Sequence, residues 1–478
     1  MMQSRRFLIN GEWRSSERKR TLYNPFTQQS VGEVFQASDT DITDAINAAT
    51  TAFQITRKLP AHRRAAILLD MAREIEAKKE TFAGLITAET GKPITFSRAE
   101  VDRSIFTFTS ASEETKRIDG SVLQLDLAQH SEDRIGLVRR FPLGPIGGIT
   151  PFNFPLNLVA HKVAPAIAAG NTIVVKPASS AVMTALLLAE VIHKTTIPKG
   201  AFNVVPCSSN EAEQLITSEQ IKLISFTGSP AVGWRIKEKA GKKKVVLELG
   251  GNAGVIVDKD AALDFALKRI VQGSYGNAGQ SCIAVQRIYV HDELYTIFME
   301  RLLEATKSVV VGDPMDEATL VGPMIDEEAA QKAEGWVKEA VAAGARLMCG
   351  GRRDGAVLDP TVLTDVKPDM KVSCEEIFAP VVTVEPFNSF EHAVAMVNNS
   401  AYGLQAGVFS NNFKNIMYAY QELEVGGVVI NDSPSYRIDH MPYGGVKNSG
   451  FGREGVRYAI EEMTEMKLMA MNLGQLDR

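Results

Sequence analysis

Residues 223–249 read LISFTGSPAVGWRIKEKAGKKKVVLEL and contain the clearest pattern of strands and helices in the chain. It begins with the apolar run 223–227 and ends with the apolar run 245–249, each of which predicts a buried strand. Between them, residues 231–240 are predicted to form a helix, because Pro230 suits the first helical position. A helix that connects two buried strands is typical of a parallel sheet.

The same alternation of strands and helices extends on both sides of this stretch. Toward the N-terminus we expect strands at 173–177 and 202–205 and helices at 181–193 and 211–218. A second series begins at Gly254, with strands at 254–257, 285–290 and 381–384 and helices at about 261–272, 292–308 and 327–343. The sequence therefore predicts an α/β protein with two doubly wound sheet domains.

The segments that precede the first series have different patterns. Residues 6–36 alternate short extended pieces with turns, which suggests an N-terminal hairpin. Residues 39–120 have helical periodicity, which Leu59-Pro60 interrupts. Residues 121–140 are expected to form two extended pieces around a polar stretch, 130–133. Such a ribbon has open strand edges, which a partner subunit could cover.

The composition is that of an ordinary globular protein. Its 478 residues exceed the size of a single core, so we expect two or three domains. A net charge of −5 argues against nucleic acid or an anionic membrane as the main partner. The four cysteines lack Cys-x-x-Cys spacing and the seven histidines lack ligand spacing, so we assign no metal site. No signal-peptide pattern and no run of about 18 apolar residues occurs, which predicts a cytoplasmic protein without a membrane span.

A candidate nucleophile, Cys282, ends a turn of small residues that reads Gly-Asn-Ala-Gly-Gln-Ser-Cys at 276–282. Small side chains would let a substrate carbonyl approach the sulfur and the neighbouring backbone amides. An ordinary thiol is only a few per cent thiolate at neutral pH, so a working cysteine needs a base or an activating environment. We pair Cys282 with Glu248, at the end of a predicted strand, where α/β sheets bind their ligands. The alternative is an inert cysteine, which is the more common role of an isolated one.

Two further motifs at strand ends suggest a phosphate or ribose. Gly228 and Ser229 join a strand to a helix, where a tight turn, a serine cap and free amides favour an anion. The alternative is a plain strand–turn–helix junction, since this is not the common glycine fingerprint of dinucleotide sites. Lys176 ends another strand and could reach a ribose or a phosphate, but it could equally be a solvated lysine.

Two more motifs lie in predicted loops. Asn153 sits between Pro151 and Pro155, which restrict the backbone, so its amide could donate to an oxyanion or satisfy a loop carbonyl. Glu376 lies close to Phe378, a pairing that suits ribose hydroxyls. The alternative is a helix-end glutamate beside a core phenylalanine.

These stretches, in this order, resemble the aldehyde dehydrogenase superfamily over essentially the whole chain. The motifs that carry the resemblance are Pro-Phe-Asn-Phe-Pro (151–155), Val-Val-Lys-Pro-Ala-Ser (174–179), Phe-Thr-Gly-Ser (226–229), Leu-Glu-Leu-Gly-Gly (247–251), Gly-Gln-Ser-Cys (279–282), Glu-Glu-Ile-Phe-Ala-Pro (375–380) and Tyr-Gly-Gly-Val-Lys-Asn-Ser-Gly (443–450). Within the superfamily the chain looks most like the lactaldehyde and non-phosphorylating glyceraldehyde-3-phosphate dehydrogenase branch.

The resemblance implies a hydrolytic oxidation of an aldehyde by NAD or NADP. Cys282 would attack the aldehyde to give a thiohemiacetal and then a thioester, and Glu248 would be the base for the water that hydrolyses it. Asn153 and the backbone N–H of Cys282 would form the oxyanion hole. Lys176 would hold the adenine-side ribose and Glu376 the nicotinamide ribose. The other positions that the resemblance places at the cofactor are Ser229 with its helix start, Gly228, Thr150, Phe152 and Phe378.

One departure from the family pattern concerns the choice of cofactor. NAD-selective relatives usually carry a glutamate three residues after the lysine, where it repels a 2′-phosphate. This chain has Ser179 instead. Since a neutral hydroxyl removes that repulsion, we expect NADP to be accepted.

The substrate is expected to be a small aldehyde that is anionic or hydroxylated. Arg103 and Arg437 would line the family's substrate tunnel, where they could clamp a carboxylate, phosphate or sulfonate. The alternative is that either arginine pairs with a neighbouring acid such as Asp102 or Asp439. Ser281 stands where phosphate-selective relatives often have another arginine, which weakens the case for a phosphate.

The resemblance also implies a division of the chain into domains. Residues 1–119 and 143–250 would bind the cofactor and residues 251–447 would form the catalytic domain. Residues 120–142 and 463–478 would be an oligomerisation ribbon and tail in a homodimer or homotetramer. Two other functions remain open: a CoA-acylating relative, which would not need Glu248 as a base, and a catalytically silent binding or structural protein on the same scaffold.

Overall fold

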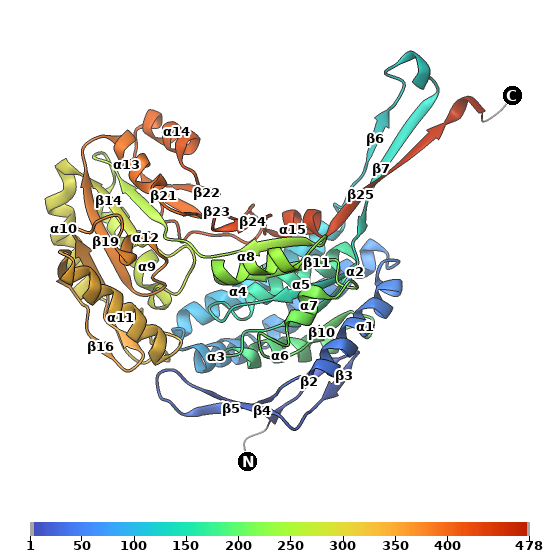
Figure 1. Cartoon of the computed structure of the whole chain (residues 1–478), viewed down its shortest axis with the longest axis horizontal. Coiled ribbons are helices and arrows are strands. Elements are labelled where there is room, and N and C mark those ends of the chain that lie inside the picture. Colours follow the sequence, from blue (N-terminus) through green and yellow to red (C-terminus); the bar gives the residue numbers. More distant parts are fainter. Residues whose placement is uncertain (1–3, 476–478) are drawn as a thin grey trace.

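The computed structural model describes residues 4–475 and contains two large sheets flanked by helices (Figure 1). This arrangement confirms the predicted α/β fold with two sheet domains. A long ribbon projects away from both of them, and the last described strand of the chain, β25 (Thr464–Asn472), lies in it.

The first sheet has eight strands in the order β24-β12-β11-β8-β9-β10-β2-β3. Its five central strands are parallel and carry apolar residues on both faces, as expected for a sheet covered by helices. The strands are β2 (Phe7–Ile9), β3 (Glu12–Arg14), β8 (Pro145–Ile149), β9 (Thr172–Lys176), β10 (Phe202–Val204), β11 (Leu223–Thr227), β12 (Lys244–Glu248) and β24 (Gly450–Phe451).

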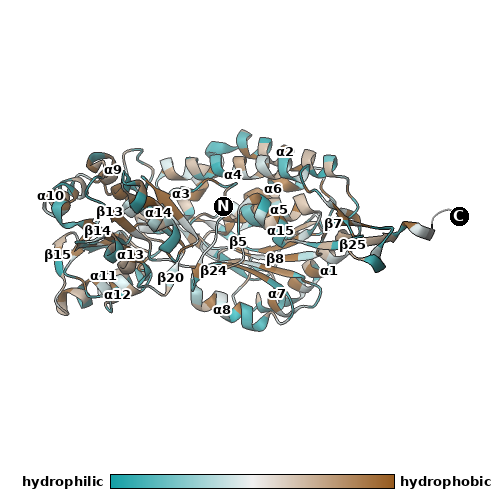
Figure 2. Cartoon of the chain, turned by 90° about the horizontal axis from the view of Figure 1, so that it is seen from above, coloured by the Kyte–Doolittle hydropathy of each residue, from teal (hydrophilic) through white to brown (hydrophobic). Residues whose placement is uncertain are grey.

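Helices cover both faces of this sheet, and two of them are almost wholly buried. Every residue of α5 (Asn157–Ala169) is buried, as are most residues of α6 (Val182–His193). Both helices are rich in alanine, valine and leucine, which lets them pack on all sides (Figure 2). The other helices around this sheet are α1 (Asp39–Thr56), α2 (Ala61–Ala77), α3 (Lys79–Thr90), α4 (Ile94–Thr115), α7 (Glu213–Thr217), α8 (Pro230–Lys239) and α15 (Val456–Glu462).

The N-terminal segment contains more than the single hairpin that the sequence suggested. β2 and β3 pair as a hairpin and extend the edge of the first sheet. A separate three-stranded sheet is formed by β1 (Ser4–Arg5), β4 (Lys19–Tyr23) and β5 (Ser30–Phe35). The predicted helix break at Leu59-Pro60 falls between α1 and α2, as the restriction that proline places on the backbone requires.

The second sheet has seven strands in the order β15-β18-β19-β14-β13-β21-β22, all parallel except β15. They are β13 (Gly254–Val257), β14 (Arg287–His291), β15 (Arg346–Cys349), β18 (Thr361–Thr364), β19 (Val381–Phe387), β21 (Gln405–Phe409) and β22 (Gly427–Ile430). The helices around it are α9 (Leu263–Tyr275), α10 (Asp292–Lys307), α11 (Glu327–Ala342), α12 (Lys371–Cys374), α13 (Phe390–Asn398) and α14 (Phe413–Glu422).

After the second sheet, the chain returns to the first. β24 pairs antiparallel with β12, and α15 packs against α4 and α5. Residues 448–462, which none of the predicted domain ranges includes, therefore belong spatially with the first sheet. Short pairs of strands complete this part of the chain: β16 (Arg353–Asp354) with β17 (Val357–Leu358), and β20 (Tyr402–Gly403) with β23 (Val446–Lys447).

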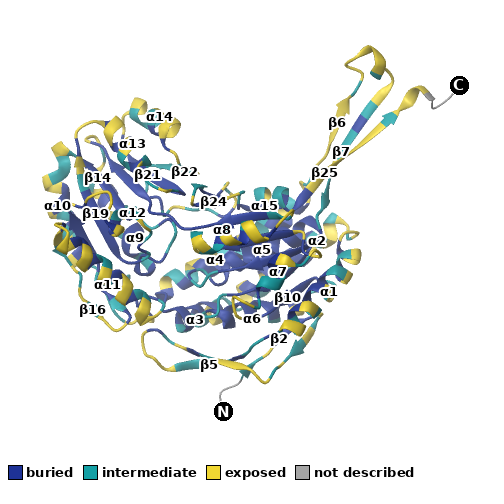
Figure 3. Cartoon of the chain, in the orientation of Figure 1, coloured by how far each residue is buried: buried dark blue, intermediate teal, exposed yellow. Residues whose placement is uncertain are grey.

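The ribbon consists of β6 (Ser121–Gln124), β7 (Arg134–Pro142) and β25 (Thr464–Asn472), with two short 3-10 helices, Gln129–Ser131 and Leu473–Gln475. β25 pairs with β7 along its entire length, so the tail predicted at 463–478 is a strand of the ribbon, apart from residues 476–478, which lie outside the described part. β6 and β25 are largely exposed (Figure 3) and carry apolar side chains such as Val122 and Met466. In residues 4–475, no helix has the length and apolarity needed to span a bilayer.

Candidate active site

Four strands of the first sheet end at the same level, and each end carries a predicted site residue. Lys176 at the end of β9 lies opposite Ile149 of β8, and Glu248 at the end of β12 lies opposite Thr227 of β11. Because the strands are parallel, these ends lie along one edge of the sheet. Thr150 follows β8 directly, and Gly228 and Ser229 follow β11. The alternation of strands and helices thus accounts for most of the predicted site.

Cys282 reaches this edge from the second sheet domain, where it lies between α9 and β14. It follows a 3-10 turn, Gly276–Gly279, in which Asn277, Ala278 and Gly279 have φ angles of 54°, 54° and 67°. Three successive residues in the left-handed region make a tight and strained turn. Such a turn fixes the direction in which the cysteine emerges.

Two glycines near Cys282 allow close packing of the backbone. A Cβ on Gly279 would lie 2.2 Å from the carbonyl oxygen of Ala379. A Cβ on Gly251 would lie 2.5 Å from the carbonyl oxygen of Cys282. Gly251 therefore lets the Leu-Glu-Leu-Gly-Gly segment touch the cysteine loop directly.

Asn153 is buried beside the same loop. Its Nδ2 donates to the carbonyl oxygen of Gln280 at 3.0 Å, and its Oδ1 has no partner in the described part of the chain. This contact is the loop-carbonyl alternative, but an amide nitrogen carries a second hydrogen that this bond does not use. Asn153 therefore contacts Gln280, two residues before Cys282, and one hydrogen of its amide group remains available to another acceptor.

The sulfur of Cys282 contacts a residue to which the sequence assigned no role. Tyr443 Oη lies 3.1 Å from Cys282 Sγ, and the guanidinium of Arg437 lies over the tyrosine ring, 3.6 Å from its centroid. Burial raises the pKa of Cys282 to about 12, and the hydrogen bond with Tyr443 opposes this shift only in part. The resting thiol is therefore protonated, and it needs a change in its surroundings before it can attack.

Glu248 is a buried carboxyl group without a partner. It is 2% exposed, and neither of its oxygens has a hydrogen-bond partner in the described part of the structure. Burial raises its pKa well above the ordinary value, and the charge of Glu454 adds to the shift, while Arg437 and Lys162 oppose it. A buried carboxyl group left unsatisfied is costly, so it marks a position where water or substrate is expected to bind.

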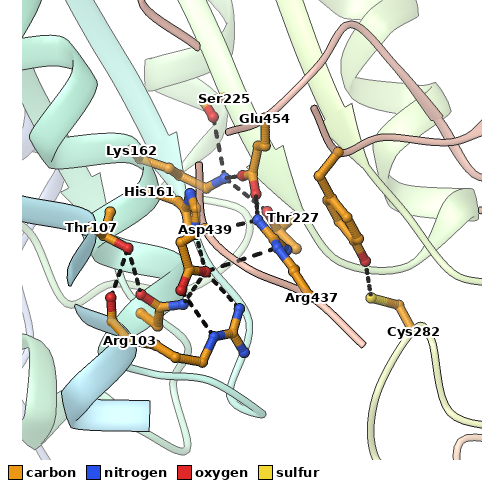
Figure 4. A network of polar contacts seen from close by, with 12 residues as sticks. Arg103, Thr107, His161, Lys162, Ser225, Thr227, Cys282, Arg437, Asp439 and Glu454 are labelled. Carbon is orange, nitrogen blue, oxygen red and sulfur yellow. Dashed lines mark hydrogen bonds and ion pairs between the residues drawn. The ribbon is translucent and has the colours of Figure 1, made fainter. Parts of the chain in front are cut away.

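A network of buried charges connects α5 with the segment 437–454, which contains Arg437, Asp439 and Glu454 (Figure 4). Lys162 on α5 donates to Glu454 Oε1 at 3.0 Å and to Thr227 Oγ1 at 2.7 Å. Arg437 donates to the other oxygen of Glu454 at 3.1 Å. Burial opposes the charge of Glu454, but the two cations outweigh it, so the pKa of Glu454 falls to about 2. Glu454 is therefore an anion close to Glu248.

Asp439 is the second acid of this network. Arg103 binds both of its oxygens, at 2.6 and 3.1 Å, while Asn157 and His161 contact Oδ1 at 3.0 and 2.8 Å. Although burial opposes ionisation, the hydrogen bond with His161 and the charge of Arg103 hold the pKa of Asp439 far below its ordinary value. Burial and the charge of Arg437 also lower the pKa of His161.

The two arginines predicted for the substrate are therefore both paired with acids in the structure. Arg103 pairs with Asp439, which is the alternative that the sequence offered. Arg437 pairs with Glu454 at 3.1 Å, which the sequence did not suggest, and its Nε also lies 3.9 Å from Asp439. Arg103 remains partly exposed, whereas Arg437 is almost fully buried.

The cofactor candidates on the first sheet also lie together. Lys176 is 7% exposed, burial lowers its pKa, and no carboxylate contributes to that pKa. Ser179 is partly exposed, three residues further on. Ser229 occupies the N-cap position of α8, with Pro230 next, but its side chain makes no cap hydrogen bond, so our expectation of a side-chain cap is wrong. The first amides of α8 are thereby left free for another acceptor.

The last group of candidates surrounds Glu376. Its Oε1 accepts from the amide of Gly251 at 3.0 Å, and burial raises its pKa to about 7. Phe378 is only half-buried, with a φ of 51°, so it is not the core residue that the alternative assumed. Its ring meets that of Phe152 edge to face, 6.1 Å between centroids. The hydroxyl of Thr150 is buried without a partner in the described residues. An unpaired amine, free helix amides and a carboxylate suit the phosphates and ribose hydroxyls of a dinucleotide.

Comparison with known proteins agrees with this geometry. The model of the "Aldehyde dehydrogenase family" matches residues 13–469. The 3-sulfolactaldehyde dehydrogenase of Priestia aryabhattai is 45% identical, over 97% of each chain. Aldehyde dehydrogenase 21 from Physcomitrella patens, solved with its reaction product succinate, has a TM-score of 0.98 and 43% identity, over 99% of this chain and 100% of that one. The glyceraldehyde-3-phosphate dehydrogenase GapN from Methanocaldococcus jannaschii, solved with NADP, has a TM-score of 0.92 and 40% identity, over 96% and 100%.

The chain belongs to the aldehyde dehydrogenase family. This confirms the resemblance found in the sequence, and the protein is an NAD(P)-dependent enzyme that oxidises small aldehydes. In residues 4–475 of this aldehyde dehydrogenase, no three histidine, cysteine or acidic side chains are grouped so that they could hold a metal ion.

Sequence reasoning assigned no role to several residues of the aldehyde dehydrogenase site. His161 and Lys162 stand out in an otherwise apolar helix, and that contrast was the available signal. Tyr443 belongs to a motif that we quoted without giving it a role. No sequence pattern pointed to Glu454, because it is brought near Glu248 only by the pairing of β24 with β12.

Proposed function

We propose that this enzyme oxidises a small aldehyde with an anionic group to its carboxylic acid, and that it releases the acid by hydrolysis. The observation that supports hydrolysis is the buried, unpartnered carboxyl group of Glu248 on the edge that also carries Asn153 and Lys176. A base that binds water is needed when water takes the acyl group, whereas transfer to CoA needs none.

The first half of the reaction uses Cys282 and Asn153. Cys282 first gives up its thiol proton to solvent; the thiolate then attacks the aldehyde carbon, and the carbonyl π electrons move to oxygen to give a thiohemiacetal anion. Asn153 Nδ2 and the backbone N–H of Cys282 donate to that oxygen. A bound dinucleotide would supply the hydride acceptor for this carbon, so that Cys282 would then carry a thioester.

The second half uses Glu248. Its carboxylate takes a proton from a water molecule while the water oxygen attacks the thioester carbon. The collapse of this adduct breaks the carbon–sulfur bond, so the acid leaves and the sulfur of Cys282 is free again. Because the pKa of Glu248 is raised, its carboxylate is a stronger base than an ordinary one.

The residues that would hold the dinucleotide are those at the edge of the first sheet and around Glu376. Lys176 and Ser179 would bind the adenine-side ribose and Glu376 the nicotinamide ribose. Ser229 and Gly228, at the start of α8, would bind the pyrophosphate. Thr150, Phe152 and Phe378 would line the nicotinamide. Ser179 carries no charge, so a 2′-phosphate is tolerated and NADP is accepted.

Arg437 and Arg103 are both paired with acids, but Glu454 is shared between Arg437 and Lys162, so the acids do not neutralise every cation. This excess of positive charge and the relatives support an anionic substrate. Arg437 stacks on Tyr443, which contacts the sulfur, so a cation lies close to the reaction centre. A sulfonated aldehyde is named for the relative from Priestia aryabhattai, aspartate semialdehyde for one from Pseudomonas canavaninivorans, and succinate is the product bound to aldehyde dehydrogenase 21. Each of these compounds carries an anionic group.

The test is NAD(P)H formation with a panel of aldehydes, with and without CoA. The panel contains 3-sulfolactaldehyde, glyceraldehyde 3-phosphate, the semialdehyde that gives succinate, and neutral lactaldehyde. We expect the anionic compounds to be the better substrates without CoA, and Arg437→Ala to raise their KM by about tenfold or more, the worth of one charged hydrogen bond. Strict dependence on CoA would indicate the acylating alternative, and no turnover with any aldehyde would indicate a silent scaffold protein.

We further propose an oligomeric state, a role for each domain and a cytoplasmic location. Residues 1–119 and 143–250 would bind the cofactor and 251–447 carry the catalysis, with 120–142 and 463–478 joining subunits of a dimer or tetramer. The exposed apolar side chains of the ribbon and its open strand edges support its proposed role in joining subunits. Four free cysteines, one of them the proposed nucleophile, suit the reducing cytoplasm. A monomeric mass in light scattering would contradict the oligomer.

A further inference from the structure

Two buried helices begin directly after the loops that carry the proposed site, and neither has a cap of its own. α5 begins at Asn157, four residues after Asn153, and α6 begins at Val182, three residues after Ser179. The residues at their N-cap positions make no side-chain hydrogen bond to the first turn. The free amides at these buried helix starts therefore need acceptors from elsewhere in the chain.

Glu100 supplies the acceptor for α5. Its Oε1 accepts from the amides of Leu156 and Asn157, at 2.8 and 3.1 Å, and its Oε2 pairs with Lys92. Both side chains are about 1% exposed or less. The amine of Lys92 also lies 3.8 Å from the ring centroid of Phe154. The residues on both sides of Pro155 are thus held by one buried ion pair, next to Asn153.

Glu89 supplies the acceptor for α6. Its Oε2 accepts from the amide of Met183 at 2.9 Å and its Oε1 from the amide of Thr184 at 3.0 Å. These are the second and third amides of the helix, the ones that an N-cap side chain normally binds. The side chain of Glu89 is buried, at 1% exposure. The loop from Lys176 to Ser180 is therefore fixed at one end by β9 and at the other by this carboxyl group.

Both acids come from one helical hairpin. Glu89 lies in the last turn of α3 and Glu100 in the second turn of α4, and only residues 91–93 connect these helices. Gly91 turns the chain with a φ of 70°, and a Cβ there would lie 2.4 Å from Pro323. The close fit of this turn fixes the spacing between the two acids.

We propose that the α3–α4 hairpin positions two parts of the site independently: Glu100 positions the Asn153 loop for the oxyanion, and Glu89 positions the Lys176–Ser179 loop for the cofactor. Glu89 and Glu100 are positioning residues, because each acts through backbone amides of another segment. The inference rests on the roles proposed above for Asn153 and Lys176.

The expected signature is a split between chemistry and cofactor binding. Glu89→Leu removes both acceptors at α6, so the Kd for NADP should rise about fivefold or more, while kcat at saturating cofactor stays within about twofold. Loss of the acceptor at α5 should do the reverse: kcat falls about tenfold or more, since one oxyanion donor is worth at least this much, and the Kd for NADP is unchanged.

Glu100 needs a paired design, because removing it alone leaves Lys92 buried and unpaired. We would compare Lys92→Met with Glu100→Gln, which keeps an oxygen acceptor, against Lys92→Met with Glu100→Leu, which removes it. The first pair should retain most of kcat and the second should lose it. Glu80→Gln is the matched control, since Glu80 lies on α3 but its side chain is exposed and pairs with Arg98 on the surface.

The measurements are calorimetric titration with NADP, steady-state kcat, and thermal unfolding for each variant. Equal kcat in the two double variants, or equal losses of kcat and NADP affinity at Glu89 and Glu100, would overturn the inference. The variant Asn153→Ala distinguishes a failure of this inference from a failure of the proposed site. If Asn153→Ala leaves kcat unchanged, the oxyanion role of Asn153 itself is wrong.

Discussion

The hydroxyl of Tyr443 lies 3.1 Å from the sulfur of Cys282, and the hydrogen bond between them opposes the effect of burial on the pKa of this thiol. Tyr443 in turn lies under the guanidinium of Arg437, whose charge also lowers the pKa of Cys282. The nucleophile and the proposed anion site are thus connected through one aromatic ring.

Tyr443→Phe should make the resting thiol less reactive. Without the hydroxyl, the pKa of Cys282 rises further above its ordinary value, so less thiolate is present at any given pH. We expect the rate of Cys282 alkylation by iodoacetamide at pH 8 to fall about threefold or more, the scale of half a pKa unit. Tyr436→Phe, at an exposed tyrosine in the same loop, is the control. An unchanged or faster rate in Tyr443→Phe would show that the hydroxyl does not stabilise the thiolate.

Glu454→Gln should move the acid limb of the pH–rate profile to lower pH. The charge of Glu454 helps to raise the pKa of Glu248. In the variant this charge is gone, whereas Lys162 and Arg437 still lower the pKa of Glu248. A base works when it is ionised, so a lower pKa extends activity toward acid, by about one pH unit. The measurement is kcat between pH 5 and 9, with Glu461→Gln on α15 as a surface control. A shift of the limb to higher pH would contradict the electrostatic account.

Cofactor affinity should increase as the pH rises through neutrality. Burial raises the pKa of Glu376 to about 7, against the amide of Gly251 and the charge of Lys332. In the proposed role, the ionised carboxylate would accept from ribose hydroxyls, whereas the protonated form would have lost part of that capacity. The Kd for NADP, measured by calorimetry, should therefore fall between about pH 6 and pH 8. Glu376→Gln should bind more weakly and lose this dependence, and a dependence that persists in the variant would have another origin.

Ser179→Glu should convert the enzyme toward NAD. A carboxylate three residues after Lys176 would repel the 2′-phosphate of NADP and accept from the ribose hydroxyl of NAD. We expect the ratio of kcat/KM for NADP to that for NAD to fall about tenfold or more, as one unfavourable charge contact would give. Ser179→Ala removes the hydroxyl without adding charge and should leave the ratio within about threefold. Equal effects of the two substitutions would remove Ser179 from the selectivity site.

The sequence predicted those parts of the fold and site that depend on local pattern. Lys176, Glu248 and the Gly228-Ser229 turn follow apolar runs of strand length, so their position at one edge follows from the parallel sheet itself. The segment 39–120 was recognised as helical, but that its hairpin supplies acceptors to α5 and α6 could not be foreseen, because those contacts join residues that lie 56 or more positions apart.

The C-terminal part of the site was the least predictable. Arg437, Asp439, Tyr443 and Glu454 lie in a stretch without regular periodicity, and they reach the first sheet because β24 pairs with β12. A single sequence carries no signal for that pairing, since β24 has only two residues. Asp439 had been named as a possible partner of the arginines, but the pairing of Arg437 with Glu454 became known only from the structure.

The mass of the Glu248→Gln enzyme after one turnover tests directly whether Glu248 drives hydrolysis of an acyl group on Cys282. Without the base, the thioester on Cys282 should persist, so mixing with NADP and a good aldehyde should give a burst of about one NADPH per active site. Mass spectrometry should then find the chain heavier by one acyl group, on the peptide that contains Cys282. A burst with no acyl group on that peptide, or steady turnover at the rate of the unmodified enzyme, would contradict the account.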